Sequence, residues 1–240
     1  MKDFVYLQDE ISMKTMNVKI SPLLVALSGV MLGISLAAAD YHVDWKVALF
    51  LTFTVISLYF YSVCSKSAQE TSKVWSGISL ALTIASALAM LYFSFGTILL
   101  MEPLLLIVFG YMIIRAVRHT SFISRGKGIL YVFVLFGLLA VYGSYYVCSH
   151  SFGSWPLIFP ALSMGFISVA AKADDDKSAF RLIMNILGWA CMASYAFLRM
   201  FDPWHFLFVL SLPVFFLKKP EWAVFAFAML TGAGFLAFLV

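Results

Sequence analysis

The sequence predicts an all-α integral membrane protein, and three observations lead to that fold class. Of the 240 residues, 63% are hydrophobic and only 12% are charged, against about 25% charged in an ordinary soluble domain. The mean hydropathy is +0.97. Apolar runs such as residues 50–61 do not alternate with polar side chains, as the strands of a membrane β-barrel would. This composition excludes a soluble enzyme, a nucleic-acid-binding protein and a disordered chain.

Nine segments have a length and composition suited to crossing a bilayer, which takes about 20 mostly apolar residues. Each is expected to be helical, because lipid offers the backbone no hydrogen-bond partners. A polar arm of residues 1–20, unlike a cleaved signal peptide, precedes a single transmembrane domain of residues 21–240. The predicted spans are residues 21–39, 46–64, 75–95, 97–114, 128–148, 154–171, 180–198, 204–217 and 221–240.

Some of these spans have features of their own. Residues 94–97 are all that separates the third span from the fourth, so a tight hairpin is expected there. The eighth span, residues 204–217, is the shortest and contains Pro213. Tryptophan is frequent at membrane interfaces, and Trp189 is the only tryptophan in the middle of a span. The five near span ends are Trp45, Trp75, Trp155, Trp204 and Trp222.

The positive charges predict the orientation. Of the 16 Lys and Arg residues, 14 fall in the N-terminal arm and in every second loop after it. Lys46 and Arg199 are the two that fall in the other loops. Because positively charged loops remain in the cytoplasm, the N-terminus is expected inside and the C-terminus outside. The pair Lys218 and Lys219 fits this pattern only if residues 204–217 cross the membrane.

Three loops on the inner side hold most of the polar residues: residues 61–73, 115–128 and 172–178. Asp174, Asp175 and Asp176 form the densest acidic cluster, and adjacent carboxylates can hold a hard divalent cation such as Mg²⁺. The alternative is a solvated turn whose negative charge favours the start of the next helix. Arg115, Arg118 and Lys127 are candidates for binding a diphosphate or anionic headgroups. The alternative for them is the positive-inside signal itself.

Two polar residues fall within predicted spans. Glu102 lies about five residues, or roughly 7 Å, below the outer end of its span, and an ionisable group there is a functional candidate. It is equally compatible with a protonated side chain or with an interfacial partner near Pro103. Asn185 lies near the inner end of the seventh span. Together with Gly165 and Gly188, it is expected to mediate helix packing.

Local stretches of the chain resemble a known family. Residues Ser21 to Gly33, followed by the run Ala-Ala-Ala-Asp-Tyr-His-Val-Asp-Trp45, resemble the first helix and outer loop of the UbiA superfamily of intramembrane prenyltransferases. Phe136-Gly137, residues 143–147 and His150 resemble its fifth helix. The similarity is greatest to the 1,4-dihydroxy-2-naphthoate polyprenyltransferases of the menaquinone pathway. It implies a nine-helix UbiA-like bundle in the cytoplasmic membrane of a bacterium.

The resemblance also implies a chemistry. In that family two aspartate-rich motifs hold Mg²⁺, which binds the diphosphate of an isoprenoid donor, and an aromatic acceptor attacks the carbocation that forms. The first motif corresponds to residues 63–70 here, where Glu70 is the only carboxylate. Lys66 places a positive charge among the expected ligands, which opposes Mg²⁺ binding. The second motif falls at Asp174 to Asp176, where the acidity is retained but the spacing is not.

Three hypotheses follow from this comparison. The first is a divergent relative that binds a polyprenyl diphosphate, an isoprenoid or a quinone lipid, with the standard Mg²⁺-dependent transfer impaired or lost. The second is an active prenyltransferase with a modified site, in which Asp174, Asp175, Asp176 and Glu70 are metal ligands. Arg115, Arg118, Lys127 and Lys66 would then bind the diphosphate. The third is a small transporter or a membrane partner subunit.

Overall fold

The computed structural model describes residues 20–40, 43–65, 70–93, 111, 126–151, 153–172, 178–199, 203–215 and 220–237. All regular structure in these residues is helical. Seven of the described helical segments are long and apolar enough to cross a membrane: 23–40, 45–64, 73–93, 128–149, 155–172, 179–198 and 220–237. The expectation of an all-α membrane protein is therefore supported. The fourth predicted span, residues 97–114, lies outside the described residues except for Tyr111.

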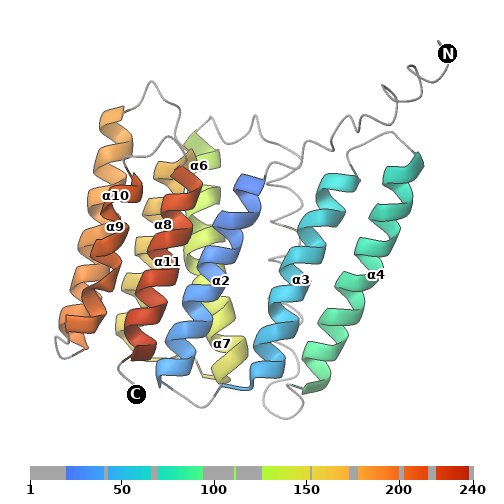
Figure 1. The fold of residues 1–240 in the computed structure, drawn as a ribbon, viewed down its shortest axis with the longest axis horizontal. Coiled ribbons are helices and arrows are strands. Elements are labelled where there is room, and N and C mark those ends of the chain that lie inside the picture. Colours follow the sequence, from blue (N-terminus) through green and yellow to red (C-terminus); the bar gives the residue numbers. More distant parts are fainter. Residues whose placement is uncertain are drawn as a thin grey trace, which may run out of the picture.

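The helices run up and down through one layered bundle (Figure 1). The first half of the described chain contains α2 (Ile20–Asp40), α3 (Trp45–Cys64) and α4 (Glu70–Phe93). The fifth predicted span contains α6 (Gly126–Val132), η2 (Phe133–Tyr142) and α7 (Gly143–Ser149). The rest consists of η3 (Trp155–Leu157), α8 (Ile158–Lys172), α9 (Ser178–Leu198), η5 (Pro203–Ser211), α10 (Leu212–Phe215) and α11 (Pro220–Ala237).

The eighth predicted span differs from an ordinary α-helix. Residues Pro203–Ser211 form a 3₁₀-helix, and only the four residues Leu212–Phe215 that follow are α-helical. A 3₁₀-helix rises about 2.0 Å per residue instead of about 1.5 Å, so these two pieces reach roughly 24 Å. Fourteen residues of α-helix would reach roughly 21 Å. The stretched helix thus brings a short segment closer to the thickness of the hydrocarbon core, about 30 Å.

Aromatic packing accompanies this 3₁₀ segment. The ring of Trp189 on α9 lies 5.2 Å from the ring of Phe208 on η5 and 5.6 Å from that of Phe227 on α11. Phe208 and Phe227 are themselves 5.7 Å apart. Trp189 therefore lies mid-span because it fills the space between three helices, which is a packing role and not an interfacial one.

The fifth predicted span is also irregular. Its ten central residues, Phe133–Tyr142, form a π-helix between two short α-helices. Gly137 in this segment packs against α8 so closely that a Cβ there would lie 2.6 Å from the Cα of Gly165. Gly165 in turn faces the ring of Phe133. A wider helix with a glycine contact lets the backbones of η2 and α8 approach each other.

The centre of the bundle is the contact of α2 with η2 and α7. A Cβ at Gly29 would lie 2.7 Å from the carbonyl oxygen of Phe136, and one at Gly33 would overlap the side chain of Ser144. On another side of α2, Gly232 of α11 faces Ser35 at 2.5 Å by the same measure. Gly29 and Gly33 are four residues apart, the spacing of the small-residue motif that lets membrane helices pack closely. We therefore take α2 as the central helix.

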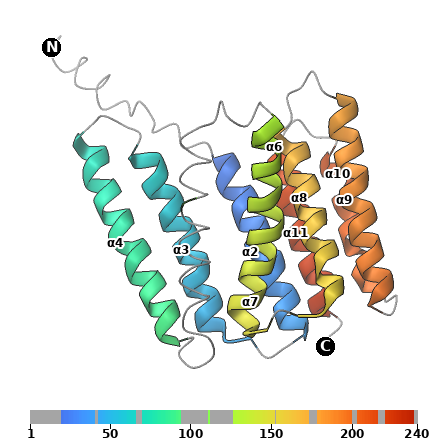
Figure 2. The same cartoon turned by 180° about the vertical axis from the view of Figure 1, so that it is seen from behind.

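The hairpin of α3 and α4 lies at one side of the bundle. Helix α3 contacts α2 and α7, whereas α4 packs on α3 and makes no comparable contact with another described helix. Figures 1 and 2 show α4 at the outer margin. Large apolar side chains on it are exposed, such as Leu82 and Leu88. In a membrane these side chains face lipid or a bound apolar molecule.

We expect Gly29→Leu to destabilise the protein by about 1–3 kcal/mol, because the added side chain meets backbone atoms in a packed interface. The measurement is the midpoint of thermal unfolding in detergent, followed by circular dichroism. Gly77→Leu on α4 is the matched control, since a Cβ there meets no atom within 4 Å. Equal losses in the two variants would contradict the central role of the α2 contact.

Candidate functional site

Most of the polar residues singled out in the sequence lie outside the described residues. These are Lys66, Glu102, Arg115, Arg118, Asp174, Asp175 and Asp176. Glu70 is the first residue of α4 and Lys127 is the second residue of α6, so their backbone positions are described. Asn185 is described with its side chain.

The helix ends that flank the three polar loops lie together. Helices α3 and α8 end, and helices α4, α6 and α9 begin, at the upper end of the bundle in Figure 1. Figure 2 shows the same arrangement from behind. Glu70 and Lys127 are therefore at one end of the molecule. The start of α3, with Lys46, and the end of α9, next to Arg199, are at the opposite end.

Asn185 is half-buried on α9, and its Oδ1 atom has no hydrogen-bond partner. The neighbouring helix α8 has two fully buried hydroxyls, Ser163 Oγ and Ser168 Oγ, that also have none. One turn along α9, Gly188 packs tightly on α8, where a Cβ would lie 2.6 Å from Ile167 Cγ1. Gly165 and Gly188 thus do lie at close helix contacts. Asn185 does not join a cluster of charged side chains in the described residues.

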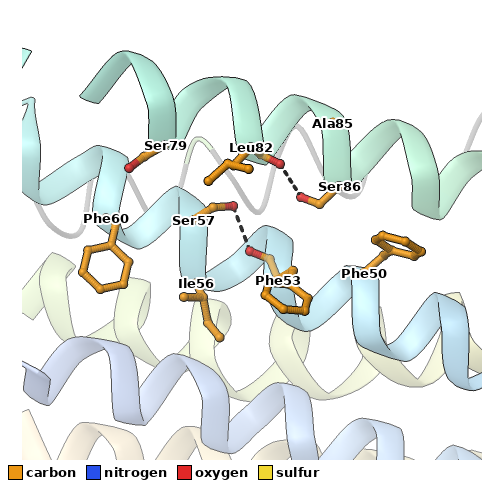
Figure 3. Close-up of a pocket in the computed structure, with 9 residues that line it drawn as sticks. All are labelled: Phe50, Phe53, Ile56, Ser57, Phe60, Ser79, Leu82, Ala85 and Ser86. Carbon is orange, nitrogen blue, oxygen red and sulfur yellow. Dashed lines mark hydrogen bonds between the residues drawn. The ribbon is translucent and has the colours of Figure 1, made fainter. Parts of the chain in front are cut away.

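A groove of about 480 Å³ lies on the hairpin of α3 and α4. Three phenyl rings of α3 line it, together with small and apolar side chains of both helices, and it is open along one side (Figure 3). The chain offers few atoms for polar contact here. The lining residues are Phe50, Phe53, Ile56, Ser57, Phe60, Ser79, Leu82, Ala85 and Ser86.

Hydroxyl groups join the two helices that form the groove. Thr54 Oγ1 donates to Ser86 Oγ at 2.9 Å, and Thr83 Oγ1 donates to Ser57 Oγ at 3.0 Å. Ser57 Oγ also donates to the carbonyl oxygen of Phe53 at 2.8 Å, and Ser86 Oγ donates to that of Leu82 at 2.8 Å (Figure 3). Because the small hydroxyl side chains keep the two backbones close, the larger side chains beside them form the walls of the groove.

A polar cluster that the sequence did not reveal lies at the opposite end of the bundle. Arg199, just after α9, forms an ion pair with Asp40 at the end of α2. The hydroxyl of Tyr145 on α7 donates to Asp40 Oδ2 at 2.8 Å. Asp40 thus joins three helices. The available signal was that Arg199 is one of the two basic residues predicted outside, but its partner is 159 positions away in the sequence.

The surroundings of Arg199 explain why it needs this partner. Its guanidinium lies 5.7 Å from the ring centre of Tyr195, within reach of a cation–π interaction. Burial lowers the pKa of Arg199 from its ordinary value, because a partly buried charge loses hydration. Asp40 is only 13% exposed. We interpret this cluster as a structural clasp, since all its charged groups in the described residues are paired.

No protein-family model matches the chain, and no curated protein and no solved structure matches it.

We expect Asp40→Asn to lower the free energy of unfolding by about 1–3 kcal/mol, because Arg199 would lose its partner while remaining partly buried. The measurement is thermal unfolding in detergent. Asp44→Asn is the control, since Asp44 caps α3 at an exposed position and asparagine caps equally well.

A second replacement tests the cause of this effect. Arg199→Gln in the Asp40→Asn background is expected to recover part of the loss, because no uncompensated charge remains. Additive losses in the double variant would show that the two side chains do not act as a pair.

Proposed function

We propose that this protein is a divergent UbiA-like membrane protein that binds an isoprenoid lipid with a diphosphate or quinone head. In this proposal the chain crosses the membrane nine times with its N-terminus in the cytoplasm. The head of the lipid lies at the cytoplasmic end of the bundle, and its hydrocarbon chain lies within the membrane.

The observation that carries the proposal is the position of the helix ends at the upper end of the bundle in Figure 1. The basic loop before α6, the acidic loop before α9 and the loop before α4 all adjoin that end. Their candidate ligands therefore face one another across the same end of the bundle in the proposed arrangement. The resemblance of residues 21–33 and 136–147 to that superfamily adds a second, independent reason.

The charges of these loops suit the binding of a diphosphate better than they suit a site with two metal ions. Arg115, Arg118 and Lys127 supply cations from one loop, and Lys66 supplies one from another. Arginine binds phosphate oxygens through paired hydrogen bonds, and lysine adds a point charge. In this arrangement the cations neutralise the head of the lipid and hold it at the membrane surface.

The carboxylates do not fit the two Mg²⁺ ions of the family. Glu70 is the only carboxylate in the first motif, and Lys66 lies four residues before it. Hard divalent cations need several oxygen ligands without a competing positive charge. Among the described residues no group of three or more His, Cys, Asp and Glu side chains lies close enough to hold a metal ion. We therefore propose binding without the standard transfer reaction.

The proposal is tested with the purified full chain in lipid nanodiscs. We expect saturable binding of radiolabelled farnesyl diphosphate that persists in EDTA. The triple variant Arg115→Gln, Arg118→Gln, Lys127→Gln is expected to bind at least roughly tenfold more weakly, since each lost charge–phosphate contact contributes about 1 kcal/mol or more. Arg125→Gln in the same loop is the control, with a small effect expected.

The same preparation tests whether the protein is an active enzyme. With farnesyl diphosphate, 1,4-dihydroxy-2-naphthoate and Mg²⁺, we expect no prenylated product. Product that disappears in the variant Asp174→Ala, Asp175→Ala, Asp176→Ala would establish the enzyme and overturn the proposed loss of activity. An absence of binding to wild type would overturn the proposed function as a whole.

A further inference from the structure

We propose that the groove on α3 and α4 holds the methyl-branched chain of an isoprenoid lipid, which enters sideways from the bilayer. This inference rests on the proposed function and adds to it the place where the chain lies. The groove is not needed to explain the fold, because α3 and α4 are already joined by their own hydroxyl contacts. Its walls are large apolar side chains that are held apart.

The chemistry of the groove selects a hydrocarbon. Phe53 and Phe60 are 56% and 38% exposed, and their rings stand at the groove beside Ile56 (Figure 3). The hydroxyls of Ser57 and Ser86 already donate to backbone carbonyls within their own helices. A polar ligand would therefore lose its hydration at this site and gain few hydrogen bonds in return. A hydrocarbon chain loses nothing, and it gains dispersion contacts with the rings.

The spacing of the walls favours a branched chain over a straight one. Phe53, Ile56 and Phe60 follow one another along one side of α3, and successive side chains in such a row are about one helical turn, or 5.4 Å, apart. An isoprene unit has four chain carbons and one methyl branch, and its length is close to that turn. The methyl branches can therefore lie in successive gaps between the ridges. A straight acyl chain has no group to fill these gaps.

The position of the groove agrees with the position proposed for the head of the lipid. Phe60 lies four residues before Cys64, the end of α3, which is about 6 Å along the helix. That end of α3 adjoins the loop that leads to Glu70. From Phe60 to Phe50 the groove extends for about 15 Å, which is room for about three isoprene units. A lipid with its diphosphate at the loops would reach the groove with its first units.

Two other occupants are less consistent with the groove. A second copy of the chain would have to bring a helix into a space lined by three phenyl rings, whereas close helix contacts in this protein occur at glycines such as Gly29 and Gly137. A water-soluble ligand would need polar partners that the lining does not provide. The isoprenoid chain is the occupant that matches the length, the spacing and the chemistry together.

The test is photo-crosslinking of the full chain in phosphatidylcholine nanodiscs with farnesyl diphosphate that carries a benzophenone near the end of its chain. We expect the label on peptides from α3 and α4. Ala85→Trp should reduce the labelling of these peptides roughly fivefold or more, equivalent to about 1 kcal/mol, because Ala85 lines the groove. Ala190→Trp, on an exposed face of α9, is the matched control and should label as wild type does.

A second variant guards against a folding defect in Ala85→Trp. The double variant Phe53→Ala, Phe60→Ala removes exposed rings, so we expect it to fold normally and to lose labelling to a similar extent. Phe197→Ala removes an equally exposed ring of α9 and should have no effect. Both groove variants labelling as wild type would overturn the proposal, as would a label concentrated on other helices.

A comparison of chain lengths separates this inference from the proposed function. Competition by unlabelled diphosphates should strengthen from geranyl to farnesyl, with two and three isoprene units, and change little for geranylgeranyl. A palmitoyl probe should label the groove weakly, and equal labelling would identify ordinary lipid contact and overturn the proposal. If farnesyl diphosphate binds wild type but the groove variants bind it equally, the proposed function stands and the groove is not its chain site. Disulfide-linked dimers of a Phe53→Cys variant that exclude the probe would assign the groove to a second copy.

Discussion

The close approach of α2 to η2 and α7 is the contact on which the rest of the structure depends. Lipid tails are as apolar as leucine side chains, so membrane helices gain little from the hydrophobic effect when they associate. They associate where small residues let their backbones come close enough for dense van der Waals contact. Gly29 and Gly33 provide that contact on one side of α2, and Ser35 receives Gly232 of α11 on another. The clasp of Asp40, Tyr145 and Arg199 then fixes the end of the same helix.

This central packing lets other parts of the molecule depart from regular structure or from burial. The π-helix η2 and the 3₁₀-helix η5 both lie against glycine contacts, at Gly165 and Gly234 respectively. The hairpin of α3 and α4 needs few contacts with the bundle, because Thr54, Ser57, Thr83 and Ser86 join its two helices directly. It can therefore keep an apolar groove open to the bilayer. Central packing and an open margin are the combination expected of a protein that takes up a lipid sideways.

Hydropathy predicted the long spans because it depends only on local composition. The predicted segment 46–64 and the observed helix Trp45–Cys64 agree almost to the residue, since Asp44 caps the helix where the apolar run begins. Pro213 and the short apolar run of 204–217 hinted at irregularity, but the choice of a 3₁₀-helix depends on packing against Trp204 and α11. The ion pair of Asp40 and Arg199 and the groove depend on which helices become neighbours. Periodicity and charge counts do not specify such pairings.

The central claim is that the protein carries an isoprenoid lipid within the membrane. The most direct measurement is native mass spectrometry of the full chain, released from membranes in a mild detergent, followed by fragmentation of whatever remains bound. The account predicts a bound species whose mass and fragments identify a polyisoprenoid diphosphate or quinone, lost when Ala85 is replaced by tryptophan. A chain that retains only phospholipid, or no lipid at all, would contradict it.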